Sequence, residues 1–325
     1  MKVIIDSHIP YIKGLLEPYA DVQYREPQAI TPDAVRDADA LIVRTLTRCD
    51  RQLLEHSRVQ FIATATIGFD HIDTDYCRQR GITWTNAPGC NAQGVCDYVE
   101  TALDYVENLK GNRRQTIGIV GVGHIGSLVA QMAERKGYTV LLNDPLRAAA
   151  EGRAQYVPLQ TIIREADIIT FHTPLTAAGD YPTWHLMNEA LLSQLRPDCL
   201  LINAARGGII DESALLRRLS QPSAPTLIID CWENEPNINT ILLRQSLIGT
   251  YHIAGYTKAG KLSATQMCLT AFCRHFDIPE TSVCTNQENS VPLQGGAGFD
   301  IERLSRQLKS APWQFRTLRQ NYPLR

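Results

Sequence analysis

The sequence lacks the long apolar runs of a membrane protein. No stretch approaches the roughly 18 apolar residues of a membrane span. The first residues, from Met1 to Asp6, enter a strand pattern at once, whereas a signal peptide has a basic segment and a longer apolar one. We therefore expect a protein that acts in the cytoplasm and binds no membrane.

Cysteine spacing and net charge exclude further classes. The nine cysteines form no CxxC pair and no zinc-binding spacing, so we expect reduced thiols, mostly in the core, and no metal site. The formal net charge is only −2, with 32 basic and 34 acidic residues. This balance argues against a nucleic-acid partner and leaves room for one local basic pocket.

Short apolar runs alternate with helical patterns along most of the chain, which favours parallel sheets covered by helices. The first series of predicted strands comprises Lys2–Asp6, Ala40–Val43, Phe61–Thr64 and Ile82–Asn86. Helical spacing separates them, as in 34–39 and 51–56. After a long helical stretch around 89–110, a second series comprises Thr116–Gly121, Thr139–Asp144, Ile168–His172, Leu200–Ala204 and Leu227–Trp232.

These two series predict an α/β fold with two doubly wound parallel-sheet (Rossmann-like) domains. We assign residues 1–94, with about 262–285, to a substrate domain and residues 95–261 to an NAD-binding domain. Residues 286–325 form a short C-terminal segment, in which Ile301, Leu304 and Leu308 make an apolar stripe. A stripe on so short a tail must cover something. We expect it to support a homodimer; the alternative is that it packs on its own subunit.

A dinucleotide motif opens the second series. Gly121-Val122-Gly123-His124-Ile125-Gly126 is a GxGxxG between the predicted strand 117–120 and a predicted helix over 127–136. In this context Gly121 allows the tight turn, Gly123 admits the pyrophosphate and Gly126 lets helix and strand pack closely. The helix N-terminus would then bind the phosphates. The alternative is a glycine turn in an α/β fold that binds no nucleotide.

Asp144 stands 18 residues after Gly126, at the end of the next predicted strand. Its carboxylate would accept hydrogen bonds from the ribose hydroxyls and repel a 2′-phosphate, which favours NAD over NADP. Arg147 nearby weakens that preference slightly.

Three ionisable residues follow strand-like runs downstream of this motif: Arg206, Glu235 and His252. A guanidinium binds a carboxylate bidentately, and an imidazole exchanges protons near neutral pH. Glu235 would orient and stabilise that imidazole. Each residue alone also has an ordinary explanation, as a surface arginine, a solvated glutamate or a structural histidine. Because all three lie at strand ends downstream of the cofactor motif, we expect them to act together in the oxidation of a hydroxy acid. The nearest rival histidine, His172, lies in a run that we interpret as cofactor contact, with Thr173 beside the nicotinamide ribose.

In the segments that carry most of these residues, the sequence resembles the D-2-hydroxyacid dehydrogenase family. The matching segments are 118–126, 171–175, 203–211 and 230–236. The resemblance implies that Arg206, Glu235 and His252 are catalytic and that Asp230 contacts the nicotinamide amide. It implies an NAD site formed by Gly121, Gly123, His124, Ile125, Gly126, Asp144, Thr173, Ala204, Ala205, Arg206, Asp230, Gly255 and Tyr256.

A second set of loops is similar to one branch of that family: 43–44, 63–66, 87–92, 252–257 and the tail 315–323. This branch oxidises 4-phospho-D-erythronate in vitamin B6 biosynthesis, as a cytoplasmic homodimer. The resemblance implies that Thr45 and Thr66 contact substrate, with Arg206 and His252. Two features depart from it: Thr45 replaces an expected serine, and the C-terminal region is shorter than in the longer relatives.

The substrate phosphate needs a cation at the end remote from the carboxylate. Arg44 is the first candidate, and Lys258 and Lys261 are alternatives; each could instead be an ordinary solvated charge. Two rival functions share these features. One is a dehydrogenase for another acid, such as 3-phosphoglycerate. The other is an NAD-sensing binding protein without enzymatic activity, since a fold does not fix a function.

Overall fold

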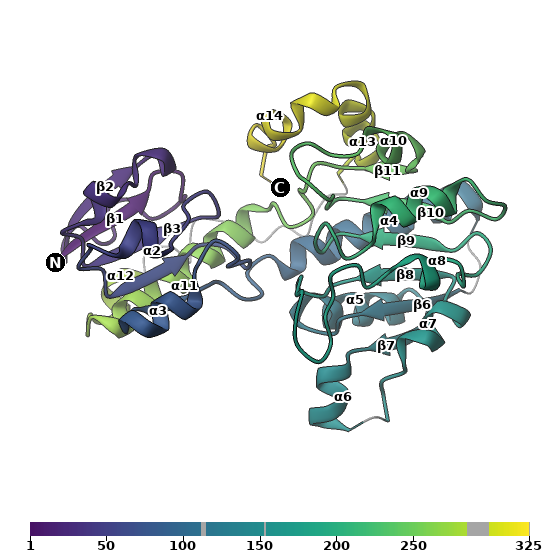
Figure 1. Cartoon of the computed structure of the whole chain (residues 1–325), viewed down its shortest axis with the longest axis horizontal. Helices are drawn as coiled ribbons and strands as arrows, with labels where there is room; N and C mark the ends of the chain where they lie inside the picture. Colours follow the sequence, from purple (N-terminus) through teal and green to yellow (C-terminus); the bar gives the residue numbers. More distant parts are fainter. Residues whose placement is uncertain (112–114, 153, 285–298, 325) are drawn as a thin grey trace. The chain divides into compact units, whose positions relative to one another are not determined.

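A computed structural model describes residues 1–111, 115–152, 154–284 and 299–324 of the chain (Figure 1). The chain divides into two compact units. Unit 1 comprises Met1–Asn91 and Tyr256–Gly295, and unit 2 comprises Ala92–Gly255 and Gly296–Arg325. The breaks fall beside long helices, because one helix begins at Ala92 and another at Lys258. These two breaks therefore lie a few residues before the predicted boundaries, and the described part of the C-terminal segment, from residue 299, belongs to unit 2.

Unit 1 is built on a five-stranded parallel sheet of order β2-β1-β3-β4-β5. Alternate residues of the buried strands face two separate cores: Ile5 and Ile42 pack with helix α11, and Ile4 and Leu41 pack with the helices of the other side. The elements are β1 (Lys2–Asp6), β2 (Asp21–Arg25), η1 (Pro27–Ala29), α1 (Pro32–Val35), β3 (Ala40–Val43), α2 (Arg51–Leu54), β4 (Phe61–Thr64), α3 (Thr74–Arg80), β5 (Thr83–Thr85), α11 (Lys258–His275) and α12 (Glu280–Cys284).

Unit 2 is built on a six-stranded parallel sheet of order β11-β10-β9-β8-β6-β7. The elements are α4 (Ala92–Lys110), β6 (Thr116–Val120), α5 (His124–Arg135), β7 (Thr139–Asn143), α6 (Pro145–Glu151), α7 (Leu159–Glu165), β8 (Ile168–Phe171), α8 (Glu189–Leu192), β9 (Leu200–Asn203), α9 (Glu212–Leu219), β10 (Thr226–Ile229), α10 (Thr240–Gln245), β11 (Ile248–Gly249), α13 (Ile301–Ser310), η2 (Pro312–Gln314) and α14 (Phe315–Gln320).

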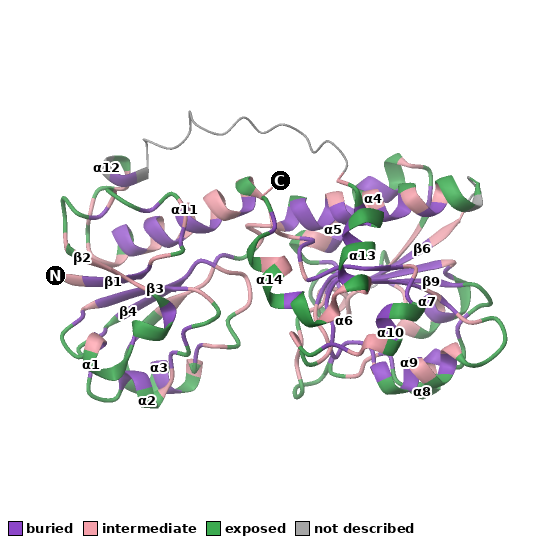
Figure 2. Cartoon of the chain, turned by 90° about the horizontal axis from the view of Figure 1, so that it is seen from above, coloured by how far each residue is buried: buried purple, intermediate pink, exposed green. Residues whose placement is uncertain are grey.

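In both units the central strands are buried, whereas helices such as α3 and α9 each have an exposed face (Figure 2). The predicted fold class, two parallel-sheet α/β domains, is confirmed. Strand β2 was missed because Asp-Val-Gln-Tyr-Arg is a half-exposed strand at the end of the sheet and contains no apolar run. The helix expected over 34–39 is α1, which begins earlier because Thr31 caps it and Pro32 starts it.

The described part of the C-terminal segment packs on its own unit. Ile301, Leu304 and Leu308 are buried, and Ile301 belongs to the unit 2 core. The Ser305 hydroxyl accepts a hydrogen bond from the N–H of Gly249 in β11. The apolar stripe thus takes the alternative role that the sequence left open, and the homodimer stays a prediction. Residues 286–298 of that segment lie outside the described residues.

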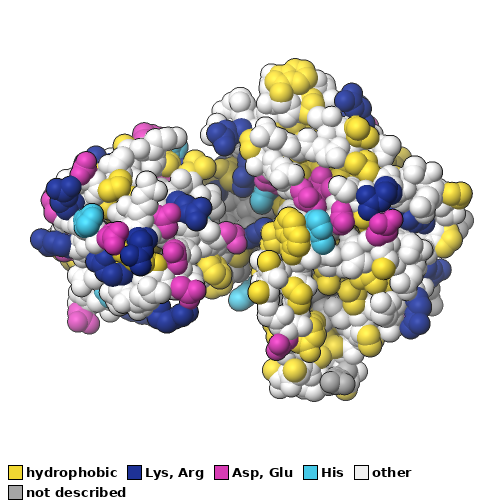
Figure 3. All heavy atoms as spheres, in the orientation of Figure 1, with side chains coloured by type: hydrophobic (Ala, Val, Ile, Leu, Met, Phe, Trp, Pro, Cys, Tyr) yellow, Lys and Arg dark blue, Asp and Glu magenta, His cyan; other side chains and the backbone are white. Residues whose placement is uncertain are grey.

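The surface gives little sign of one dominant charge. On the face shown in Figure 3, acidic and basic side chains are interspersed. Within the described residues, no helix has both the length and the apolar character needed to cross a membrane. All eight cysteines whose side chains are described are free thiols.

Candidate active site

The register of the unit 2 sheet brings the predicted site residues to one end. Asn143, Val120, Phe171, Asn203, Ile229 and Gly249 are paired in sequence across the six strands. The residues that come after them therefore leave the sheet side by side. The strand order reverses between β6 and β8, and ligands of open α/β sheets bind outside the carboxyl ends at such a point.

The glycine turn after β6 has the shape that a pyrophosphate needs. Gly121 has a φ of +88°, and a Cβ there would lie 2.8 Å from the backbone nitrogen of Thr173. A Cβ on Gly126 would lie 2.0 Å from the Gly121 carbonyl oxygen, so only glycine lets the helix approach. Nothing lies within 4 Å of a Cβ on Gly123, and α5 begins next to it with His124 and Ile125. An open space beside a helix N-terminus suits a phosphate.

Two further groups fit a dinucleotide. The buried Thr173 hydroxyl has no hydrogen-bond partner among the described residues, and such a group normally has one. The Asp144 carboxylate accepts hydrogen bonds from the N–H groups of Val122 (2.9 Å) and Arg147 (3.0 Å), which holds it beside the glycine turn. The Arg147 guanidinium is paired with Glu151 at 2.7 Å. Its charge is thereby partly neutralised, which supports the expected preference for NAD.

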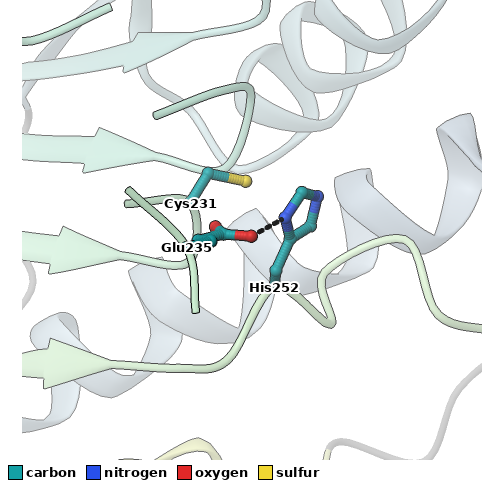
Figure 4. Close-up of side chains that lie close together, drawn as sticks. All are labelled: Cys231, Glu235 and His252. Atoms are coloured by element: carbon teal, nitrogen blue, oxygen red, sulfur yellow. Dashed lines mark hydrogen bonds and ion pairs between the residues drawn. The ribbon is translucent and has the colours of Figure 1, made fainter. Parts of the chain in front are cut away.

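Glu235 and His252 form a hydrogen-bonded pair (Figure 4). His252 Nδ1 lies 2.8 Å from Glu235 Oε2, and Glu235 Oε1 accepts a hydrogen bond from the N–H of Trp232 at 3.0 Å. Burial alone would raise the pKa of Glu235. The neighbouring His252 and the hydrogen bonds from His252 and Trp232 outweigh burial and lower the pKa below its usual value. The carboxylate is therefore charged and able to stabilise a protonated imidazole.

Asp230 fixes the loop that carries His252. Its fully buried carboxylate accepts hydrogen bonds from the Thr250 hydroxyl (2.6 Å) and from the N–H groups of Ile253 (2.8 Å) and Ala254 (2.9 Å). His252 has a φ of +59° between these contacts. A non-glycine residue persists in this conformation only where its surroundings enforce it. The sequence suggested a cofactor contact for Asp230 and missed this structural role.

Arg206 lines a pocket with both members of the pair. The pocket measures about 280 Å³ and lies within unit 2. Its polar side chains are Arg206, Glu233, Asn234, Glu235 and His252, and its other lining residues are Leu175, Trp184, Gly207 and Trp232. The structure therefore brings all three predicted catalytic residues together. Ala204 and Ala205, predicted at the cofactor, are buried immediately before Arg206.

Cys231 lies against the Glu235–His252 pair, as Figure 4 shows. One potential ligand atom from each of Cys231, Glu235 and His252 falls within a 4.8 Å cluster. Burial raises the pKa of the Cys231 thiol well above its usual value, and metals bind the thiolate. The carboxylate and imidazole are already bonded to each other. We therefore interpret the cluster as a proton-transfer pair beside a buried thiol.

Two of the three predicted substrate residues of unit 1, Arg44 and Thr66, have hydrogen-bond partners within that unit. Arg44 binds Asp6 through Nε at 2.9 Å and Nη2 at 3.3 Å. Thr45, the next residue, is exposed. The Thr66 hydroxyl donates to the carbonyl of Gly68 at 2.8 Å.

The predicted residues around the start of α11 lie close together. Lys258 is exposed and is the first residue of the helix. Lys261 Nζ lies 4.2 Å from the centre of the Tyr256 ring, within reach of a cation–π contact. Gly255, the other predicted NAD contact, closes this segment of unit 2.

Sequence reasoning missed four lining residues that come from irregular segments: Trp184, Trp232, Glu233 and Asn234. The last three stand between Asp230 and Glu235, so the spacing of the predicted site could have drawn attention to them. Trp184 lies in a loop after β8 without a motif. His172, the rival histidine, is buried and bonded to the Thr170 hydroxyl at 3.0 Å. Burial lowers its pKa to about 3, so it is a poor candidate for the base.

Comparisons with known proteins identify the family. Residues 102–254 match the model of the "D-isomer specific 2-hydroxyacid dehydrogenase, NAD binding domain". Erythronate-4-phosphate dehydrogenase of Bacteroides fragilis is 47% identical over 341 aligned positions, which cover 100% of this chain and 97% of that protein. The enzyme of the same name from Marinobacter nauticus is 44% identical, over 86% of this chain and 74% of its own length.

Solved structures share the fold. A 3-phosphoglycerate dehydrogenase of Entamoeba histolytica with bound NAD⁺ has a TM-score of 0.72 at 23% identity, covering 91% of this chain and 99% of that one. D-Lactate dehydrogenase of Aquifex aeolicus, in complex with NAD and lactic acid, has a TM-score of 0.68 at 24% identity, covering 85% and 96%.

Proposed function

The chain belongs to the erythronate-4-phosphate dehydrogenases, within the D-isomer specific 2-hydroxyacid dehydrogenases, and we propose that it oxidises 4-phospho-D-erythronate to (R)-3-hydroxy-2-oxo-4-phosphooxybutanoate with NAD. This is a step of pyridoxal 5′-phosphate (vitamin B6) biosynthesis. The observation that carries the proposal is the 47% identity over the whole chain, joined to an Arg206–Glu235–His252 set in one pocket.

The oxidation removes a hydride from C2 of the substrate and a proton from the C2 hydroxyl. When bound, NAD⁺ supplies the acceptor for the hydride of C2. His252 takes the hydroxyl proton, and Nε2 is the nitrogen that does so because Nδ1 is bonded to Glu235. The charged Glu235 stabilises the imidazolium and keeps the ring in one orientation. Arg206 holds the substrate carboxylate, and the product is the 2-oxo acid.

The cofactor site is built around the glycine turn. Gly121, Gly123 and Gly126 form the space for the pyrophosphate. Asp144 would bind the adenosine ribose and the unpartnered Thr173 hydroxyl the nicotinamide ribose. Asp230, whose carboxylate already accepts three hydrogen bonds, would take the nicotinamide amide as a further donor.

The substrate phosphate is assigned to the residues of unit 1. Arg44 remains the first candidate, with Thr45 as a neighbouring hydroxyl donor; Thr66, the other predicted contact, would have to release the Gly68 carbonyl to donate to substrate. The ion pair with Asp6 means that a phosphate would share the Arg44 guanidinium with a carboxylate. Exposed Lys258, at the start of α11, is the alternative cation. We also propose that the protein acts in the cytoplasm and that it forms a homodimer. Light scattering of the intact chain would test the homodimer.

A substrate panel tests the proposal. We would measure NADH formation with 4-phosphoerythronate, erythronate, D-lactate and 3-phosphoglycerate as substrates. The proposal requires the largest kcat/KM for 4-phosphoerythronate. Preference for 3-phosphoglycerate would instead assign the protein to another branch of the family. Binding of NADH without turnover of any acid would identify a binding protein.

A further inference from the structure

The active-site pocket has an aromatic wall that the catalytic mechanism does not use. Trp184 lines the pocket beside Arg206 and His252, and it remains 49% exposed. Large apolar side chains with this exposure are informative when the fold holds them in place, because an immobilised apolar surface in a concave site commonly contacts a ligand.

Trp184 is held from several sides. Its ring stacks on His185, with 4.4 Å between ring centres and 15° between planes. Its backbone N–H donates to the carbonyl of Thr176 at 2.9 Å. A Cβ on Gly208 would lie only 2.4 Å from the indole, so the ring rests directly on that glycine, two residues after Arg206. The indole and the carboxylate-binding arginine therefore occupy the same short stretch of the pocket.

His185 connects this wall to the catalytic loop. Its Nε2 lies 3.0 Å from Glu233 Oε1, and its backbone N–H donates to the carbonyl of Gly208 at 2.7 Å. Glu233 stands two residues before Glu235, and its backbone N–H donates to Glu212 Oε1 at 2.8 Å. The loop that carries the catalytic carboxylate and the indole that lines the pocket thus share one fixed support.

We infer that Trp184 is a specificity-determining residue whose indole limits the pocket to unbranched 2-hydroxy acids, with His185 and Glu233 as the residues that position it. This inference rests on the proposed function, because it assumes that Arg206 holds the carboxylate of the acid. An acid bound to Arg206 through its carboxylate brings its remaining carbons against the indole, where an added methyl branch meets the ring.

The test compares two acids that differ in bulk alone. We would measure kcat/KM for the reduction of 2-oxo-4-methylpentanoate and of pyruvate by NADH, and take the ratio. In Trp184→Ala the ratio should rise by roughly tenfold or more, the usual range for a few methylene groups in a tight pocket. With 4-phosphoerythronate, the same variant should raise KM about tenfold and change kcat by less than about twofold, because the indole contacts no reacting atom.

Three variants serve as controls. Trp184→Phe retains an aromatic wall and should stay within about threefold of the wild-type ratio. Trp313→Ala removes an indole that is 78% exposed in η2, outside the pocket lining, and should leave the ratio unchanged. His185→Asn removes the stacking partner and should raise the ratio part of the way, since the indole loses its support.

The outcomes separate this inference from the proposed function. Wild-type protein that fails to oxidise 4-phosphoerythronate contradicts the proposed function, and the bulk ratio still decides the role of Trp184. A folded Trp184→Ala protein with the wild-type ratio overturns the inference, as does an equal rise in Trp313→Ala. If Trp184→Ala does not fold, Trp184→Leu is measured in the same way: a raised ratio supports the inference and an unchanged ratio overturns it.

Discussion

The two units have sheets of the same topology but carry different residues beyond the carboxyl ends of their strands. Unit 1 is ordered β2-β1-β3-β4-β5, and unit 2 repeats this order as β7-β6-β8-β9-β10 before adding β11. In unit 1 the first strand ends at Asp6, a buried carboxylate that binds Arg44 after the third strand. In unit 2 the first strand leads into Gly121 and the open space at Gly123. The same topology thus places a carboxylate at the end of the first strand in unit 1 and a glycine turn that suits a phosphate after the first strand in unit 2.

The residues around the proposed base make the difference between the units clearer. At the strand ends of unit 1, Thr66 is satisfied by the carbonyl of Gly68 and by the Thr64 hydroxyl. At the strand ends of unit 2, buried Asp230 enforces a strained loop that presents His252 to a pocket. Function therefore depends on a few residues after the strands, and the shared topology provides the frame.

The largest effect is expected at His252. His252→Asn removes the base while the asparagine tolerates a positive φ. It should lower kcat by roughly 10²–10⁴-fold and leave NADH binding, measured by fluorescence titration, nearly intact. His56→Asn, at an exposed position after α2 in unit 1, is the control and should retain full turnover. Wild-type turnover in the His252 variant would place the base elsewhere and remove the contrast between the units.

The next effect tests whether unit 1 contributes chemistry at all. If Arg44 binds the substrate phosphate, the wild type should prefer 4-phosphoerythronate over erythronate by at least about 100-fold in kcat/KM, or about 2.7 kcal/mol. Arg44→Ala should reduce that preference without harming erythronate.

Asp6→Asn should have the opposite effect on binding of the phosphorylated acid. It removes the carboxylate that competes for the same guanidinium, so it should lower KM for the phosphorylated acid. A large preference that neither substitution changes would keep the substrate and move the phosphate to the lysines near α11. Equal efficiency on both acids would dismiss the phosphate assignment.

The sequence predicted features that depend on local pattern. The buried strands Ala40–Val43 and Phe61–Thr64 were placed to the residue, because parallel strands covered on both faces are continuous apolar runs. Arg206, Glu235 and His252 were found because each comes after such a run. Trp184 and His185 were missed, since a stacking pair in a loop has neither period nor motif. The role of Asp230 was also missed, because two of its three partners are backbone N–H groups that any sequence supplies.

The third prediction concerns pH: the stability contributed by Asp39 in unit 1 and by Glu212 in unit 2 should change with pH in opposite directions. In unit 1, burial raises the pKa of Asp39, but the hydrogen bond and charge of Arg58 outweigh it and lower the pKa below 3.8. The stability from that pair is lost as the pH falls. In unit 2, burial, with the charges of Glu233 and Glu235, raises the pKa of Glu212 to about 7 from 4.5. Folded protein then binds more protons than unfolded protein, and stability is lost as the pH rises from about 4.5 through about 7.

Glu212→Gln tests the predicted loss of stability with rising pH. Glutamine retains an acceptor for the Glu233 N–H and carries no charge. Urea unfolding should therefore show a stability gain of about 2 kcal/mol at pH 8 and only about a quarter of that gain at pH 5. A gain of the same size at both pH values would mean that the effect is packing and has no proton linkage.

The smallest effect is expected at Asp144, after the second strand of unit 2. The residues at the ends of the second strands of the two units carry opposite charges. Strand β2 of unit 1 ends at Arg25, and β7 of unit 2 is followed by Asp144. If the carboxylate selects NAD, Asp144→Ala should weaken NAD binding about tenfold and NADP binding much less, a change of about 1.4 kcal/mol in the preference.

Asp144 also caps α6 through the N–H of Arg147, so alanine removes a cap as well as a charge. Asp144→Asn separates the two, because asparagine is an equally good cap. An NAD preference that falls in both variants assigns selection to the charge. A preference that falls only with alanine assigns it to the position of the loop, and one that moves in neither rejects Asp144 as the ribose ligand.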